Sequence, residues 1–166
     1  MPELFLLRHA KSDWSDPGLA DIERPLNPRG RGAARAMGRY LAGRSRVDEV
    51  WASPAVRVAE TIDGLRASFE DLPPTQIVER LYAARAETLL EVLHGADCER
   101  LLLVAHNPGL EDLAMLLTRD RVSDARRRLA GKYPTAALAE ISFDCEWQDL
   151  DAGRARLEGF TRPRDL

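Results

Sequence analysis

Two of the three histidines in this chain stand at matched positions, each just past the end of a short apolar run. His9 follows the run at residues 4–7 after one intervening arginine, and His106 directly follows the run at residues 101–105. Arg8 precedes His9, and Arg57 falls in the first turn of an expected helix. A planar guanidinium group suits bidentate contact with phosphate oxygens, and imidazole can act as nucleophile or base near neutral pH. These four residues together predict a pocket for a phosphate-like oxyanion.

The elements that must position these residues follow from the apolar pattern. The runs at 4–7 and 101–105 have the length and composition of strands buried on both faces. Further strands are expected at residues 49–52, 76–78 and 137–143, with a weaker one at 156–160. Apolar residues at helical spacing predict helices around residues 33–41, 55–69, 89–93 and 110–117. This alternation predicts an α/β fold, a three-layer α/β/α sandwich with a mostly parallel central sheet.

Three of the expected helices start with the same pair, an N-cap residue followed by proline at the first helical position. The pairs are Asn27-Pro28, Ser53-Pro54 and Asn107-Pro108. Two of them come directly after expected strands, so their free N–H groups and positive dipole ends should lie at the carboxyl edge of the sheet. Open α/β sheets bind their ligands at this edge. If the strands at 4–7 and 101–105 are neighbours, His9 and His106 face each other across it.

Composition limits the classes of protein to consider. The 166 residues fit one globular domain, residues 1–166, and the net charge of −3 gives no reason to expect a nucleic acid or a membrane as partner. The only cysteines, Cys98 and Cys145, have no metal-type spacing, which favours a reducing, cytoplasmic location. Because arginines would repel a cation in the expected pocket, we expect neither a metal nor another cofactor.

Three blocks of sequence carry a resemblance to a known family. They are Leu7-Arg8-His9-Ala10-Lys11-Ser12, the stretch 53–61, and Ala105-His106-Asn107-Pro108-Gly109. In this order they resemble the signature blocks of the histidine phosphatase superfamily, the phosphoglycerate-mutase-like proteins. The form of the first block resembles the small SixA-type branch of phosphohistidine phosphatases, as do the stretches 133–137 and 162–166. The resemblance covers nearly the whole chain and implies a phosphoglycerate-mutase-like fold.

The resemblance implies a role for each residue of the expected pocket. His9 is the nucleophile that takes the phosphoryl group, Arg8 and Arg57 hold the phosphate oxygens, and His106 completes the pocket. A neutral imidazole nitrogen attacks phosphorus well, and the phosphoenzyme splits one difficult displacement into two easier ones. Since charge in the transition state is spread over the equatorial oxygens, positioning and positive potential are the main requirements.

Several further residues are weaker candidates. Lys11, Ser12 and Trp14 could line the mouth of the pocket, and Ser12 is the best of them for a hydrogen bond to phosphate. Asn107 is a candidate phosphate ligand, with simple helix capping as the alternative. The arginines at 126–128 could offer an acidic partner domain a landing site, with a solvated helix face as the alternative.

The chain departs from the wider family at one position. Mutase-type and many phosphomonoesterase members carry a glutamate in a Leu-x-Glu block after the third strand, and it protonates the leaving oxygen. The matching stretch here is Leu81-Tyr82-Ala83. Without that acid an alkoxide leaves poorly, whereas the protonated ring of phosphohistidine departs as neutral imidazole, whose conjugate acid has a pKa of about 6.5. Glu79, Tyr82 and Glu87 are left as substitute acids.

Together these observations predict a metal-independent phosphatase with a covalent phosphohistidine intermediate. The expected substrate is phosphohistidine in a protein, such as a histidine phosphotransfer domain. The first alternative is a phosphomonoesterase acting on a small phosphorylated metabolite, and the second is a binding module that recognises phosphate without catalysis. The direction of the pKa shift of His9 stays open, because a bound phosphate dianion raises that pKa and the arginines lower it.

Overall fold

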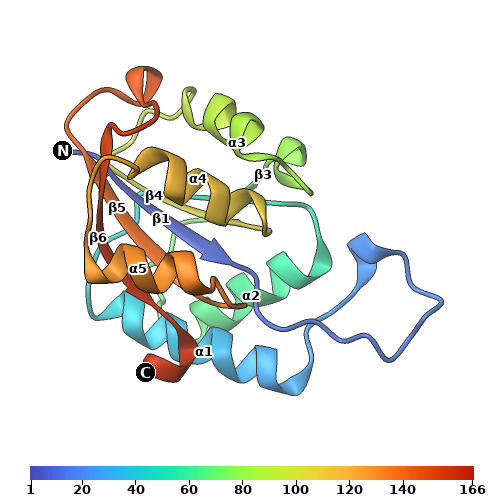
Figure 1. Cartoon of the computed structure of the whole chain (residues 1–166). Helices are drawn as coiled ribbons and strands as arrows, with labels where there is room; N and C mark the ends of the chain where they lie inside the picture. The colour runs from blue at the N-terminus through green and yellow to red at the C-terminus, as the bar shows by residue number, and fades with distance from the viewer.

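The computed structural model describes all 166 residues, and its helices cover both faces of a six-stranded sheet (Figure 1). The strands are β1 (Glu3–Arg8), β2 (Glu49–Ala52), β3 (Thr75–Ile77), β4 (Arg100–Ala105), β5 (Leu138–Phe143) and β6 (Ala155–Thr161). The helices are α1 (Pro28–Ala42), α2 (Val56–Arg66), α3 (Ala86–Leu93), α4 (Gly109–Leu117) and α5 (Asp124–Gly131). None of these helices combines the length and apolar character that crossing a membrane requires. The α/β/α sandwich and its six expected strands are confirmed.

The order of the strands places the two histidine-bearing strands side by side. The sheet runs β3-β2-β4-β1-β5-β6, with the first four strands parallel and β5 and β6 antiparallel to their neighbours. In the β1–β4 pair, Arg8 lies opposite Ala105. The next residues, His9 and His106, therefore leave the sheet together at its carboxyl edge.

Each strand of the central pair contributes to two separate apolar layers. Leu4 and Leu6 of β1 pack with α3, α4 and α5, whereas Phe5 and Leu7 pack on the other side with α1 and α2. Burial on both faces explains why β1 is a continuous apolar run rather than an alternating one. The ends of these strands are held rigidly because both of their faces are covered.

Of the three helix starts predicted from N-cap–proline pairs, the structure agrees with one and differs from two. Asn27 Oδ1 accepts from the N–H of Gly30 at 2.8 Å, and α1 begins at Pro28 as predicted. The predicted starts of the other two helices were wrong, because α2 begins at Val56 and α4 at Gly109. The Ser53 hydroxyl does not cap α2, since it is engaged with a histidine ring described below.

The segment 119–134, for which the apolar pattern predicts neither a helix nor a strand, contains α5. Ser123 Oγ accepts from the N–H of Arg126 at 3.1 Å and so caps this helix. Leu129 is its one buried residue, so α5 has no apolar stripe by which the sequence could reveal it.

The crossing of α1 and α2 gives a test of the packing. A Cβ at Gly38 would lie 2.7 Å from the carbonyl oxygen of Leu65 and 2.8 Å from its Cα, whereas a Cβ at Gly32 would meet nothing within 4 Å. We expect Gly38→Ala to lower the free energy of unfolding by about 1–3 kcal/mol through overpacking. Gly32→Ala, in the same helix, should raise it by about 0.5–1 kcal/mol. Urea unfolding of both variants checks this, and equal effects would contradict the close contact.

Candidate active site

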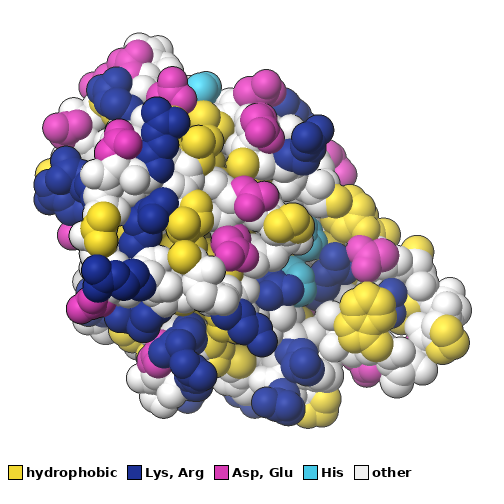
Figure 2. Space-filling model, viewed as in Figure 1, with side chains coloured by type: hydrophobic (Ala, Val, Ile, Leu, Met, Phe, Trp, Pro, Cys, Tyr) yellow, Lys and Arg dark blue, Asp and Glu magenta, His cyan; other side chains and the backbone are white.

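His9 and His106 form a buried pair at the carboxyl ends of β1 and β4. Their ring centroids lie 5.2 Å apart with an angle of 57° between the ring planes. The two residues are 7% and 6% exposed. In Figure 2, histidine atoms are visible beside Lys and Arg side chains near the base of the projecting loop. The structure thus brings together the two imidazoles that the sequence placed at matched strand ends.

The ring of His9 is fixed by the backbone of the next residue. Its Nδ1 lies 2.7 Å from the carbonyl oxygen of Ala10. Since a carbonyl only accepts, Nδ1 carries the proton and Nε2 holds the lone pair of the neutral ring. Ala10 is held in turn, because its N–H donates to Thr61 Oγ1 of α2 at 2.9 Å. The nitrogen that keeps a lone pair for reaction is therefore Nε2.

The guanidinium group of Arg57, in the first turn of α2, lies between the two rings. Its Nε donates to Nε2 of His9 and its Nη2 to Nδ1 of His106, both at 3.4 Å. Nη1 donates to the backbone carbonyl of Asp21 at 2.7 Å, and Nη2 is 3.0 Å from Asp21 Oδ2. Arg57 is 8% exposed, and a buried cation must be compensated. One carboxylate and several hydrogen-bond acceptors compensate its charge here.

Ser53, after β2, positions the ring of His106. Its Oγ lies 2.7 Å from Nε2 of His106 and also accepts from the N–H of Ala55 at 3.3 Å. Because Arg57 donates to Nδ1, the proton of the neutral ring sits on Nε2 and is donated to Ser53. The sequence explained Ser53 by helix capping alone and missed this contact.

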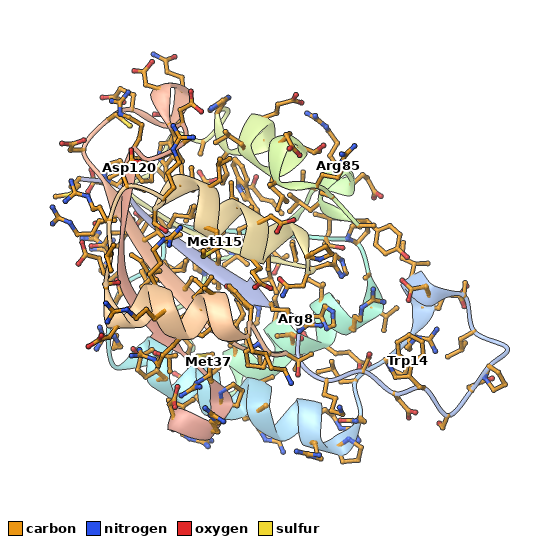
Figure 3. The ribbon with its side chains drawn as sticks, in the orientation of Figure 1. Arg8, Trp14, Met37, Arg85, Met115 and Asp120 are labelled. Atoms are coloured by element: carbon orange, nitrogen blue, oxygen red, sulfur yellow. The ribbon has the colours of Figure 1, made fainter.

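Arg8 and Asn107 are tied to one backbone carbonyl. Nη1 of Arg8 and Nδ2 of Asn107 both donate to the oxygen of Tyr133, at 2.9 and 3.2 Å. Asn107 Oδ1 also accepts from the N–H of Glu111 at 3.2 Å, so its side chain satisfies the first turn of α4 although Pro108 is the N-cap residue. Nε of Arg8 is buried without a hydrogen-bond partner, and Figure 3 shows Arg8 at the end of β1. Contact of Asn107 with phosphate stays a prediction.

Asp21 was not among the residues predicted from the sequence, and Tyr82 was predicted only as a substitute acid, yet both residues contact the site. Asp21 begins a short 3-10 helix (Asp21–Glu23) in the loop between β1 and α1, and its Oδ2 accepts from Tyr82 Oη at 2.5 Å. The ring of Tyr82 meets that of His106 edge-on, with centroids 5.4 Å apart. The hydrogen bond between Asp21 and Tyr82 lowers the pKa of the carboxyl and raises the pKa of the phenol. The only signal for Asp21 in the sequence was a carboxylate in the loop after the His9 block that no predicted turn explains.

The other loop candidates lie further from the histidine pair. Ser12 is buried and its backbone bridges to Leu26, but its hydroxyl forms no hydrogen bond to the pocket residues. Trp14 is 70% exposed on the projecting loop, where the guanidinium group of Arg24 stacks 3.8 Å from its ring (Figure 3). Lys11 is exposed. A hydrogen bond from Ser12 to phosphate stays a prediction.

Burial makes both imidazoles weak bases. The pKa of His9 is lowered to about 4, mainly by burial and also by the charges of Arg57 and Arg8, while the hydrogen bond to Ala10 opposes this shift. The pKa of His106 is lowered to about 3, mainly by burial, with His9 and Arg57 as the next causes. Both rings are therefore neutral at neutral pH, and Nε2 of His9 keeps its lone pair.

Comparison with known proteins gives consistent matches over this chain. Residues 4–82 match the model of the histidine phosphatase superfamily, branch 1. An uncharacterized protein of Mycobacterium tuberculosis is 38% identical, covering 95% of this chain and all of the relative. A structure from Agrobacterium tumefaciens, assigned as the phosphohistidine phosphatase SixA, superposes with a TM-score of 0.82 at 29% identity, covering 98% of this chain and 99% of the other. A protein from Nakamurella multipartitia with the same assignment gives 0.82 at 26% identity, covering 98% and 96%.

The lowered pKa values can be measured directly. Because each folded-state pKa lies below the ordinary value of about 6.5, we expect the rings of His9 and His106 to stay neutral down to pH 5. NMR spectra of the imidazole nitrogens, recorded across this pH range, measure the protonation of both rings. Inorganic phosphate should raise the pKa of both rings, since a nearby dianion favours the charged form. Protonation of either ring at pH 6.5 or above in the free protein would contradict the burial found here.

Proposed function

Because this chain belongs to the histidine phosphatase superfamily, in its SixA-type branch, we propose that it is a metal-independent phosphatase that acts on protein phosphohistidine. His9 Nε2 attacks the phosphorus of a phosphohistidine whose ring is protonated on its other nitrogen. The ring takes the electron pair of the breaking phosphorus–nitrogen bond and leaves as neutral imidazole. A water molecule then attacks phosphorylated His9, which leaves as a neutral ring with its proton on Nδ1, and phosphate is released. The observation that carries the proposal is the lone pair of a neutral His9, held toward Arg57 and beside His106.

The residues around His9 fit the charge that a phosphoryl group brings. The guanidinium groups of Arg8 and Arg57 supply donors for its oxygens, and Nε of Arg8 is a buried donor with no protein partner. In the loose transition state the charge lies on the equatorial oxygens, where positioned cations stabilise it. No three His, Cys, Asp or Glu side chains lie together as a metal site would need, and this agrees with a proposed pocket in which arginine supplies the positive charge.

The acids available near the pocket favour a leaving group that needs little protonation. Glu79 and Glu87 are exposed and form no hydrogen bond to the pocket residues. Asp21 contacts the site, but Tyr82 and Arg57 lower its pKa, so it is ionised at neutral pH. Tyr82 holds its proton more tightly than a free phenol because it donates to Asp21. Neither Asp21 nor Tyr82 is therefore a good proton donor at neutral pH, and phosphohistidine is the substrate that loses least from this.

The variant His9→Ala tests the nucleophile. We expect it to abolish turnover of a phosphohistidine peptide and to abolish acid-labile labelling of the protein by ³²P, because no other neutral imidazole has the same approach to phosphorus. His94→Gln is the matched control, since the third histidine lies at the end of α3, where its Nε2 contacts the carbonyl of Leu150 at 2.8 Å. Undiminished activity in His9→Ala would reject the mechanism. A strong preference of the native chain for an alkyl phosphate would reject the substrate class.

The variant Tyr82→Phe tests whether the reaction needs an acid. With phosphohistidine as substrate we expect kcat to change by less than about tenfold, because imidazole departs without strong assistance. The comparison substrate is an alkyl phosphate, for which any residual turnover should depend more on a proton donor. A loss of about a hundredfold or more on phosphohistidine would make Tyr82 a general acid and contradict this account.

A further inference from the structure

A strongly basic cavity lies beside the active site. Its volume is about 520 Å³, and five of the nine residues that line it are Lys or Arg, with no acidic residue among them. The five are Lys11, Arg29, Lys132, Arg162 and Arg164. Figure 2 shows Lys and Arg side chains gathered over the part of this face where α1 and the C-terminus lie. Because the whole chain carries a net charge of −3, this concentration of positive charge is local.

Two chain segments join the cavity to the active site. Lys11 stands two residues after His9. Pro134 follows directly after Tyr133, whose carbonyl oxygen accepts from Arg8 at 2.9 Å. A ligand in the cavity therefore touches the same two segments that carry and hold the phosphate-binding residues.

Four of the five cations have no acidic partner. Lys11, Arg29, Lys132 and Arg164 are exposed and form no ion pair. Arg162 is the exception, since its Nη2 lies 2.9 Å from Oδ1 of Asp165. The first turn of α1, which carries Arg29, contains no acidic residue, so the positive end of the helix dipole adds to the potential.

The arginines of α5 are engaged elsewhere. Nη2 of Arg126 and Nη2 of Arg128 each donate to a backbone carbonyl, at 3.2 and 3.1 Å. Nη1 of Arg127 pairs with Asp124 at 2.9 Å. The free basic surface next to the active site is therefore the cavity, and not the run of arginines that the sequence had indicated.

We propose that this cavity binds Asp and Glu side chains of the protein that carries the phosphohistidine, and so docks that protein for transfer to His9. This inference rests on the proposed function for its substrate, but the cavity and its charge are independent of the chemistry. Exposed Lys and Arg side chains on long stems can follow carboxylates that are spread over a protein surface. Complementary charges of this kind speed association and fix orientation.

The lining of the cavity favours a protein over a nucleic acid. No aromatic residue lines it, so it lacks a platform on which bases could stack. The negative net charge of the chain also opposes binding of a long polyanion. A local cluster of carboxylates needs no aromatic platform, and it is too small to be repelled by the net charge of the whole chain.

The test compares two triple variants that change the net charge equally. The first, Arg29→Glu/Lys132→Glu/Arg164→Glu, reverses three exposed cations of the cavity and leaves the residues around His9 intact. The control, Arg35→Glu/Arg46→Glu/Arg121→Glu, reverses three exposed arginines outside the cavity lining. Substrates are a phosphohistidine peptide with four flanking glutamates, the same peptide with serines instead, and free phosphohistidine.

We expect the cavity variant to lower kcat/KM for the acidic peptide by about tenfold or more, mainly through KM. Turnover of free phosphohistidine should stay within about twofold of the native value, which also shows that the variant is folded. The control variant should differ little from the native chain on all three substrates. An equal loss on all three substrates, an equal loss in both variants, or no preference of the native chain for the acidic peptide would overturn the proposal.

A binding measurement separates this inference from the proposed function. Fluorescence anisotropy of a labelled, unphosphorylated acidic peptide should show salt-sensitive binding to the native chain and weaker binding to the cavity variant. This result would support the cavity even if the chain failed to hydrolyse phosphohistidine, which would defeat the proposed function alone. Tighter binding of a single-stranded oligonucleotide of the same charge would overturn the choice of a protein partner.

Discussion

The active site depends on one buried cation shared between two imidazole rings. Arg57 donates to Nε2 of His9 and Nδ1 of His106, and this arrangement orients the lone pairs of both rings toward the position of the guanidinium group. A buried guanidinium is costly unless it is paired and hydrogen-bonded. The carboxylate and backbone carbonyl of Asp21 supply that pairing. The loop that carries Asp21 is therefore part of the site, although it contributes nothing to the sheet.

The sheet makes this interaction possible, and most of the sheet could be predicted from the sequence. Residues 4–7 and 101–105 are apolar at every position because β1 and β4 are buried on both faces, which is a local signal of a central parallel strand. The pairing of β1 with β4 is a long-range property that no local pattern specifies, so from the sequence it could only be assumed. The helix starts at 53 and 107 were misplaced because the polar residues there bond to the site and to neighbouring segments instead of serving only as caps.

The part of the site that could be predicted consists of His and Arg residues that stand at or near the ends of predicted strands. Arg8, His9 and His106 stand at strand ends, and Arg57 follows a strand by a few residues, so the topology alone brings them near one another. Asp21 and Tyr82 belong to irregular segments, and their meeting depends on the path of two loops that no periodicity describes. Ser53 was visible, but capping gave a sufficient local explanation for it and concealed its contact with His106.

The cations of the active site and those of the cavity act over different ranges. In the proposed mechanism, the buried Arg57 and the partly buried Arg8 meet the phosphoryl group at short range, where their effect on the barrier is large. Arg29, Lys132 and Arg164 are exposed, and at physiological ionic strength their fields are screened over about 8 Å. In the proposed docking they help capture and orient a partner but add little to the breaking of the phosphorus–nitrogen bond. On these proposals, selection of the leaving group and selection of the protein that carries it are separable, and the exposed cations could change without loss of the proposed chemistry at His9.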